Sequence, residues 1–273
     1  MKNMENYSIL MTVYKKDNPE FVKSSIDSML SQSHLTNDFV IVCDGELTEE
    51  LNSLVDKYSS TYPDIFNVTR LPVNIGLGAA LRYGVPVCKN EFIARMDDDD
   101  IAKPERCACE VQYLQSNPGC ALVGAHMNEF CEDPSHTVRV KKVPVGFDNI
   151  KKYARRRNPF NHSTVMFRKS AVIQAGNYSE MRTNQDVELW VRMLNSGYRC
   201  ENVDMVLLDF RFDDSTLDRR KTWENAKLMI DIWRNFWKNN YCSMMDYLVV
   251  KWAQVAIYIM PKKLLKWIYD HLR

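Results

Sequence analysis

The chain lacks both an excess of charge of one sign and a long apolar run. Its 36 Lys and Arg nearly balance its 35 Asp and Glu, which leaves a net charge of +1. Bulk electrostatics therefore do not favour nonspecific binding of nucleic acid, and we expect no nucleic-acid partner. The longest uncharged apolar run, Trp252 to Met260, is far shorter than the ~20 residues that a helix needs to cross a bilayer.

Regularly spaced cysteines and a secretion signal are also missing. The eight cysteines are scattered, several of them inside apolar stretches, so their spacing does not suggest a disulfide framework. Only one residue separates Cys107 from Cys109, and no second pair follows, so packing within a helix explains them better than zinc. The N-terminus has no apolar signal segment. We therefore expect a reduced, cytoplasmic protein.

Short apolar stretches alternate with segments of helical periodicity through the first hundred residues. Strands are predicted at 8–13, 38–43, 67–71 and 91–96, and helices at 19–32, 48–58 and about 78–88. This alternation predicts an α/β fold with a mostly parallel, Rossmann-like sheet that is covered by helices on both faces. Later elements are predicted as helices at 104–115, 169–175 and 186–194 and as strands at 121–130 and 138–143.

Four consecutive carboxylates, Asp97 to Asp100, directly follow an apolar strand. Adjacent like charges repel, so this cluster is costly unless a cation lies among them. If the strand continues to Asp99, alternation places Asp97 and Asp99 on one face. Mg²⁺ or Mn²⁺ takes one or two protein carboxylates and completes its shell with water and phosphate oxygens. The alternative is a solvated acidic loop that complements the N-terminus of the next helix.

Polar residues also follow the first two strands. Thr12 and Tyr14 end the first strand, and Asp44 follows the second. Ligands of open α/β sheets bind outside the carboxyl ends of the strands, so we predict a nucleotide pocket here. Tyr14 would stack on the base, and Asp44 would accept a hydrogen bond from it. Each residue taken singly fits a turn or a cap equally well.

Two glycine-dependent nucleotide motifs are absent or incomplete. Gly76-Leu-Gly78-Ala-Ala-Leu81 has leucine where the dinucleotide fingerprint has its third glycine, and the first β-α turn lacks the pattern. An NAD enzyme is therefore disfavoured. The segment 12–17 is also not the Gly-rich phosphate loop that a sugar nucleotidyltransferase would show after its first strand.

A predicted helix places Asp186, Leu189, Trp190 and Met193 on one face. Asp186 then lies on the inward side of the first turn, where it either accepts a proton from an acceptor hydroxyl or caps the helix. Glu188 points elsewhere. His162 is lone, and a lone histidine is more often a hydrogen-bonded core residue than a ligand.

Two later segments suggest surface interactions. Residues 151–157 contain five basic residues in seven, which fits a solvated helix face or a site for lipid phosphate or an acceptor diphosphate. From 222 onward the pattern is helical and rich in Trp and Tyr. Its apolar stripe is Leu248, Trp252, Val255 and Ile259, and after Pro261 come Leu264, Leu265 and Ile268 opposite Lys262, Lys263 and Lys266. This pattern resembles an interfacial membrane anchor. The alternative is helices that pack on the catalytic domain or on a partner chain.

Taken together, the motifs resemble family 2 glycosyltransferases of the bacterial capsule, O-antigen and exopolysaccharide type, which have the nucleotide-diphospho-sugar transferase (GT-A) fold. The matching stretches, in the family's order, are Thr12-Val-Tyr14, Asn74-Ile-Gly76-Leu-Gly78, Ala94-Arg-Met-Asp97-Asp98-Asp99-Asp100-Ile with Pro104-x-Arg106, and Asn158-Pro-Phe-Asn-His162 followed by Gln185-Asp186-Val-Glu-Leu-Trp190. They span about residues 8 to 195. The sequence departs at Gln185, where the family usually has Glu, and at Ser163, where Pro is common.

The resemblance implies a role for each matching residue. Asp97 and Asp99 would bind Mn²⁺ or Mg²⁺, and Asp186 would be the catalytic base. Nucleotide contacts would come from Thr12, Tyr14, Asp44, Asn74, Gly76, Asp97 and Asp98. Residues at or behind the acceptor site would be His162, Glu188 and Trp190.

The resemblance also implies an activity and a domain plan. The activity is inverting transfer of a hexose or N-acetylhexosamine from a UDP-sugar to a lipid-diphosphate-linked saccharide at the inner face of the cytoplasmic membrane. Residues 1–215 would form the catalytic domain, with a nucleotide-binding half at 1–100 and an acceptor-binding half at 101–215. Residues 216–273 would form a helical membrane-association region. The alternatives are a noncatalytic metal- or membrane-binding module with the same fold, or a sugar nucleotidyltransferase.

Overall fold

The computed structural model describes residues 4–212, 218 and 221–265. The chain separates into two compact units. The first unit comprises Met1–Lys151 and Pro159–Arg211, and the second comprises Lys152–Asn158 and Phe212–Arg273. The functional division predicted from the sequence stays a prediction.

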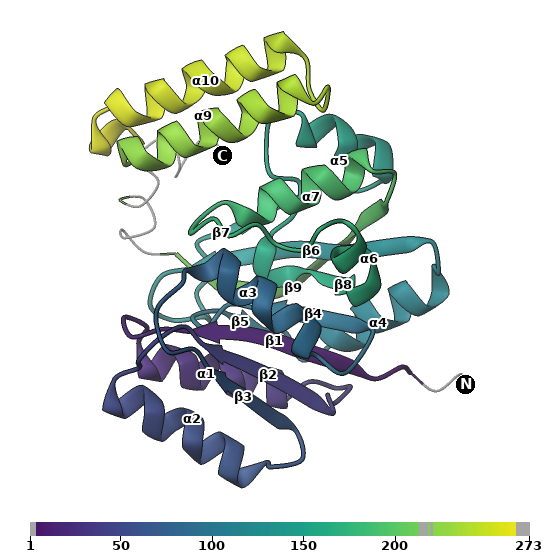
Figure 1. The fold of residues 1–273 in the computed structure, drawn as a ribbon, viewed down its shortest axis with the longest axis vertical. Helices are drawn as coiled ribbons and strands as arrows, with labels where there is room; N and C mark the ends of the chain where they lie inside the picture. Colours follow the sequence, from purple (N-terminus) through teal and green to yellow (C-terminus); the bar gives the residue numbers. More distant parts are fainter. Residues whose placement is uncertain (1–3, 213–217, 219–220, 266–273) are drawn as a thin grey trace. The chain divides into compact units, whose positions relative to one another are not determined.

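One curled sheet organises the first unit, with strand order β3-β2-β1-β4-β8-β6-β9-β5 and with β7 on β6 (Figure 1). The four strands at one end are parallel to one another: β1 (Tyr7–Val13), β2 (Asp38–Cys43), β3 (Phe66–Arg70) and β4 (Phe92–Met96). All four were predicted from their apolar runs. They confirm the α/β class.

The remaining strands pair in both directions. They are β5 (Ile101–Ala102), β6 (Cys120–Phe130), β7 (Arg139–Lys141), β8 (Met166–Arg168) and β9 (Arg199–Arg211). β8 is antiparallel to both β4 and β6, whereas β6 and β9 are parallel. Sequence reasoning missed β9 because polar residues interrupt it, and its clearest signal is the short run Val206-Leu-Leu208.

Helices cover both faces of the sheet, as predicted. They are α1 (Pro19–Leu30), α2 (Glu49–Thr61), α3 (Leu77–Val87), α4 (Arg106–Ser116), α5 (Phe147–Ala154), α6 (Lys169–Gln174) and α7 (Gln185–Asn195), with a 3₁₀ turn at His162–Thr164. Asn18 and Thr48 begin α1 and α2 as N-caps, since their side chains accept hydrogen bonds from the first-turn N–H groups of Glu20 and Leu51.

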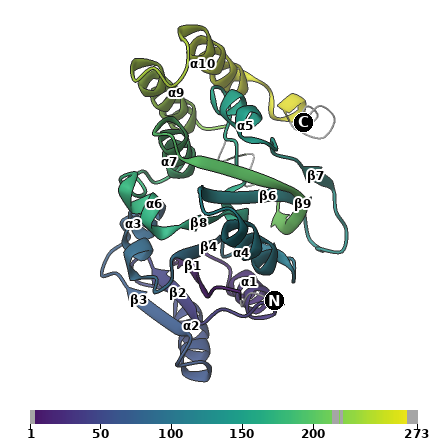
Figure 2. The same cartoon turned by 90° about the vertical axis from the view of Figure 1, so that its right-hand side faces the viewer.

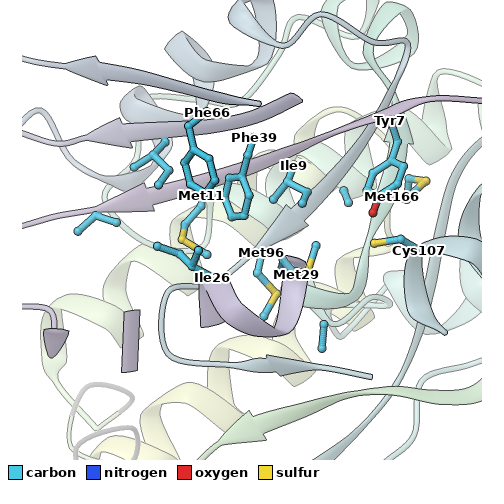
Figure 3. Packing of buried hydrophobic residues seen from close by; sticks show 14 of the residues in the cluster. Tyr7, Ile9, Met11, Ile26, Met29, Phe39, Phe66, Met96, Cys107 and Met166 are labelled. Carbon is cyan, nitrogen blue, oxygen red and sulfur yellow. The ribbon is translucent and has the colours of Figure 1, made fainter. Parts of the chain in front are cut away.

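The main core lies between the sheet and α1, α2 and α4. Alternate residues of β1, Tyr7, Ile9 and Met11, face it together with Phe39 and the thiol-bearing Cys107 of α4 (Figure 3). Burial of Cys107 agrees with the prediction that this cysteine serves packing. The intervening Leu10 faces α3 instead, and a Cβ at Gly84 of that helix would lie only 2.4 Å from it.

The second unit is built on α9 (Trp223–Lys238) and α10 (Met244–Ile259), which run side by side (Figures 1 and 2). Trp237 and Tyr247 stack across the pair with ring centroids 5.7 Å apart. Ser243 and Asp246 form a reciprocal capping box at the start of α10. In the described part of the chain, no helix has both the length and the apolar character required to span a bilayer.

The basic run is partly structural. Arg155 Nε and Arg156 Nε donate to the two carboxylate oxygens of Asp246 at 2.9 and 2.6 Å. Burial by itself would raise the pKa of Asp246, but hydrogen bonds from Ser243, Arg156 and Arg155 lower it to about 2. Both guanidinium groups remain about half exposed. The solvated-face hypothesis therefore describes only part of their role.

Candidate active site

The acid cluster is a turn, not the continuation of a strand. β4 ends at Met96, and the chain turns through Asp98 and Asp99 before β5 begins. It must turn because Ile101 and Ala102 pair with β9 rather than with the neighbours of β4. The alternation argument for Asp97 and Asp99 therefore fails, although both carboxylates remain half-exposed.

Two arginines, the buried Arg95 and the partly exposed Arg211, contact this turn. Arg95, whose side chain is 1% exposed, forms an ion pair with Asp97. Arg211 donates from its backbone N–H to Asp100 Oδ1 at 3.1 Å and from Nε to the Asp99 carbonyl at 3.2 Å. The Arg211 guanidinium lies between two aromatic rings, 3.8 Å from the centroid of Phe21 and 4.7 Å from that of Phe130.

Sequence reasoning missed both arginines. The signal for Arg95 was a single cation inside the apolar strand that feeds the acid cluster. Arg211 gave no such signal, because it ends the unpredicted strand β9.

Several carboxylates crowd together at this turn. Desolvation, reinforced by the charges of Asp17 and Asp97, raises the pKa of Asp98 well above its usual range. Desolvation, followed by the charges of Asp99 and Asp97, does the same to Asp100. Asp17 lies next to Asp98 and was also missed; desolvation raises its pKa to about 6.

The carboxylates of the acid turn fit a divalent cation that also binds the phosphate oxygens of a ligand. Within the described residues, no three His, Cys, Asp or Glu side chains are arranged to enclose an ion. Mg²⁺ and Mn²⁺ at nucleotide sites need only one or two carboxylates, because phosphate and water oxygens supply the rest. Asp97 and Asp99 are the residues that would hold the ion.

Arg106 fixes the backbone directly before the turn. It is fully buried in α4, and its Nη2 donates to the Arg95 carbonyl at 2.7 Å while its Nε lies 3.2 Å from Glu110 Oε1. Glu110 is also fully buried, and burial raises its pKa to about 7 despite the arginine. Arg106 of the Pro104-x-Arg106 motif therefore holds the end of β4, from which the acid turn begins.

Replacing Arg106 by methionine is expected to destabilise the protein by about 3–5 kcal/mol, because Glu110 would be left buried without its partner. Urea unfolding of the purified variant measures this free energy. The double variant R106M/E110L should recover most of the loss, since two apolar residues replace the pair. A single variant as stable as the wild type would show that the ion pair does not hold α4 in place.

The predicted nucleotide residues converge at one edge of the sheet. In the parallel ladder, Val13 of β1 is opposite Cys43 of β2, and Met11 is opposite Met96 of β4. The residues at these strand ends are therefore neighbours: Thr12, Tyr14, Asp44 and Asp97. Thr12 is buried, whereas Tyr14 is 39% exposed.

Asp44 organises the loop that follows β3. Its Oδ1 accepts the Ile75 N–H at 2.7 Å, and its Oδ2 accepts the Gly76 N–H at 2.9 Å and Asn74 Nδ2 at 2.8 Å. An ionised carboxylate has about four acceptor positions. The loop thus uses most of them, and the base contact predicted for Asp44 stays a prediction.

A pocket of about 350 Å³ opens beside this loop. None of the predicted nucleotide residues lines it, although its wall begins at the residue after Asp44. Its lining is Gly45, Glu46, Leu47, Asn52, Arg70, Leu71 and Pro72.

The Asn74–Gly78 loop is joined to the segment that leads into α7. Arg182 Nη1 donates to Asn74 Oδ1 at 2.9 Å, and the Gly78 N–H donates to the Met181 carbonyl at 3.1 Å. A Cβ at Gly78 would lie 2.2 Å from the Ser179 carbonyl oxygen, so only glycine fits. Gly78 therefore serves close packing against the segment that leads into α7.

Asp186 lies in the first turn of α7, half-buried, with Leu189, Trp190 and Met193 buried on the helix as predicted. Tyr178 packs edge-on to Trp190 of the same helix, with ring centroids 5.9 Å apart. The Tyr178 hydroxyl is 3.2 Å from His162 Nε2. Desolvation, followed by the charge of Arg95, lowers the pKa of His162 well below its usual range. This neutral histidine and Trp190 belong to an aromatic cluster that supports α7.

Tyr178 relates the acid turn to Asp186. Burial raises the pKa of its phenol, the Arg95 cation opposes this shift, and the charges of both Asp186 and Asp97 add to it. Tyr178 also packs against Trp190, one turn along α7 from Asp186. Glu188 differs, because Arg192 holds it in an ion pair at 2.8 Å.

A family model described as glycosyl transferase family 2 matches residues 8–176, which is more than half of the chain. The chain belongs to this family. It is 32% identical over 263 residues to an Escherichia coli protein named UDP-Gal:alpha-D-GlcNAc-diphosphoundecaprenol beta-1,3-galactosyltransferase, an alignment that covers 96% of this chain and 94% of the relative. It is 30% identical to the amylovoran biosynthesis glycosyltransferase AmsE of Erwinia amylovora, over 97% of this chain and 98% of the relative.

Solved structures confirm the predicted fold of this family 2 glycosyltransferase. The mannosyltransferase PcManGT of Pyrobaculum calidifontis, solved with GDP-Man and Mn²⁺, superposes with a TM-score of 0.67 at 14% identity, over 95% of this chain and 71% of that chain. TarS of S. aureus with UDP-GlcNAc gives a TM-score of 0.64 at 14% identity, over 98% and 73%. The sequence prediction of a family 2 enzyme of the bacterial surface-polysaccharide type is confirmed.

Proposed function

We propose that this family 2 glycosyltransferase moves a hexose or N-acetylhexosamine from a UDP-sugar to a hydroxyl of a saccharide carried on a lipid diphosphate. The E. coli relative is named for UDP-Gal as donor and a GlcNAc-diphosphoundecaprenol acceptor, and it aligns over nearly the full length of both chains. That relationship supports the same classes of donor and acceptor here, with galactose, glucose and their N-acetyl derivatives as candidate sugars.

The observation that carries the proposal is that the acid turn and Asp186 both act on the same side chain, Tyr178. Asp97 directly follows β4 and Asp186 lies in the first turn of α7, about ninety residues apart in the sequence, yet the charges of both raise the pKa of Tyr178, which packs against Trp190 of α7. A donor diphosphate held at the acid turn would therefore present its sugar towards α7.

The chain's own residues then divide the chemistry. Arg95 and Arg211 fix the acid turn, where Asp97 and Asp99 would hold a divalent cation that binds the diphosphate end of the donor. Asp186 accepts the proton of the acceptor hydroxyl. At the same time the hydroxyl oxygen bonds to the anomeric carbon of the donor sugar, and the bond between that carbon and the UDP oxygen breaks. This single displacement inverts the anomeric centre and requires no carboxylate nucleophile. Negative charge on the departing diphosphate is neutralised when Mg²⁺ or Mn²⁺ is bound at the turn.

A donor and acceptor screen tests the proposal. The full-length protein is incubated with individual UDP-sugars, a lipid-diphosphate-linked saccharide and Mn²⁺ or Mg²⁺, and products are identified by mass spectrometry. We expect the acceptor mass to rise by one glycosyl residue with one or a few UDP-sugars. Release of pyrophosphate from UTP and a sugar phosphate would instead indicate a nucleotidyltransferase. Binding of UDP without turnover of any donor would favour a noncatalytic module.

A further inference from the structure

The second unit exposes a continuous apolar stripe on α10. Met245 is 64% exposed, Val249 42%, Trp252 63% and Ile259 71%. Their spacing of four, three and seven residues places them on one side of the helix. Ala256, also exposed, fills the gap between Trp252 and Ile259.

This stripe is rotated from the one predicted from the sequence. Leu248 and Val255 are half-buried, because the neighbouring Tyr247 and Val250 are the residues buried in the unit. The second predicted anchor helix also changes its role. Leu265 is buried against Phe212, Ile257 and Met260, so it holds the chain after Pro261 onto α10. Leu264 is exposed, whereas Lys266 and Ile268 lie outside the described residues.

The unit that bears the stripe is strongly cationic. Residues 152–158 and 212–273 contain 15 of the chain's 36 Lys and Arg but only 7 of its 35 Asp and Glu. Their net charge is therefore +8, whereas the whole chain carries +1.

Cations lie close to the stripe itself. Arg155 and Arg156 bind Asp246, the residue next to Met245, and each keeps about half of its side chain in solvent. Lys251 lies over the ring of Trp252 at 5.5 Å. Lys263 is exposed just beyond the end of α10.

We propose that this face of the second unit docks on an anionic lipid membrane. Exposed Trp, Ile, Val and Met side chains on one side of a helix enter the region between headgroups and acyl chains, and the surrounding cations bind the lipid phosphates. A symmetric dimer through this face fits less well, because it would bring together two units that each carry +8. The inference extends the proposed function by naming the surface through which the enzyme reaches a lipid-linked acceptor.

Vesicle sedimentation of the full-length protein tests the inference without any sugar donor. We expect the wild type to sediment with vesicles that contain phosphatidylglycerol, less at high salt, and weakly with pure phosphatidylcholine. The variant W252S/I259S should bind the anionic vesicles at least about tenfold more weakly, since it loses two large apolar groups. The charge variant K251E/K263E should lose the preference for anionic vesicles but keep its weak binding to neutral ones.

Leu35→Ser is the matched control, because Leu35 is 65% exposed but belongs to the first unit. It should bind vesicles like the wild type, and circular dichroism should show that all variants are folded. Equal vesicle binding by W252S/I259S and the wild type, or no binding by either, would overturn the proposal. So would a wild-type dimer in sedimentation velocity that W252S/I259S abolishes, since the face would then join two copies. UDP binding, measured separately, should be unchanged in W252S/I259S, so failure of the membrane proposal is distinguishable from failure of the proposed activity.

Discussion

Asp186→Asn is expected to lower glycosyl transfer by about 10²-fold or more, because the amide keeps the shape of the side chain but cannot accept the hydroxyl proton. The affinity for UDP should change little, since Asp186 is assigned to the acceptor hydroxyl and none of the predicted nucleotide residues lies on α7. Steady-state rates with the donor and acceptor found by the screen, together with calorimetric titration of UDP, separate the two effects.

Glu188→Gln is the matched control on the same helix. Glu188 is engaged by Arg192 in an ion pair, so its loss should affect stability more than turnover. If Asp186→Asn turns over at nearly the wild-type rate while Glu188→Gln does not, the base is Glu188 and the assignment of Asp186 is wrong.

Asp99→Asn is expected to weaken both UDP binding and the dependence of activity on Mn²⁺. It removes one negative charge from a carboxylate that would hold the cation to which the diphosphate binds. Titration of UDP with and without Mn²⁺ measures this directly, and the gain in affinity on adding the ion should largely disappear in the variant.

Asp64→Asn provides a control for the loss of one carboxylate, because Asp64 is exposed in the segment before β3. It should bind UDP like the wild type with or without Mn²⁺. Full activity and an unchanged response to Mn²⁺ in Asp99→Asn would remove Asp99 from the site.

The parts of the fold that sequence predicted are those with an unbroken local pattern. β1, β2 and β4 are short apolar runs, and α1 and α2 have both helical periodicity and a capping residue. β9 has neither, because polar residues such as Asn202 and Asp204 interrupt it. It becomes a strand by pairing along β6, a tertiary effect that a local pattern does not contain.

Some residues of the candidate site could likewise be predicted from a local sequence pattern, and others could not. Asp97, Asp99 and Asp186 were predictable because carboxylates at a strand end or on an inward helix face are conspicuous. The arginines that hold the turn were not. Arg211 is more than a hundred residues from Asp99, and only the fold brings its guanidinium between Phe21 and Phe130.

The orientation of the C-terminal helices shows a third kind of difficulty. α10 is apolar on several sides, so its sequence does not determine which side faces α9. Asp246 supplies the missing constraint. Its contacts with Arg155 and Arg156 fix the rotation of the helix and leave Trp252 outside.

The anomeric configuration of the product tests the central claim most directly. Proton NMR of the glycan made from an α-linked UDP-hexose reports, through the coupling of its anomeric proton, whether the new bond is α or β. A single displacement with Asp186 as the base predicts a β-linked product with the wild type and a strongly reduced amount of the same product with Asp186→Asn. An α-linked product would contradict the account, because back-side attack by a hydroxyl that Asp186 deprotonates must invert the anomeric carbon.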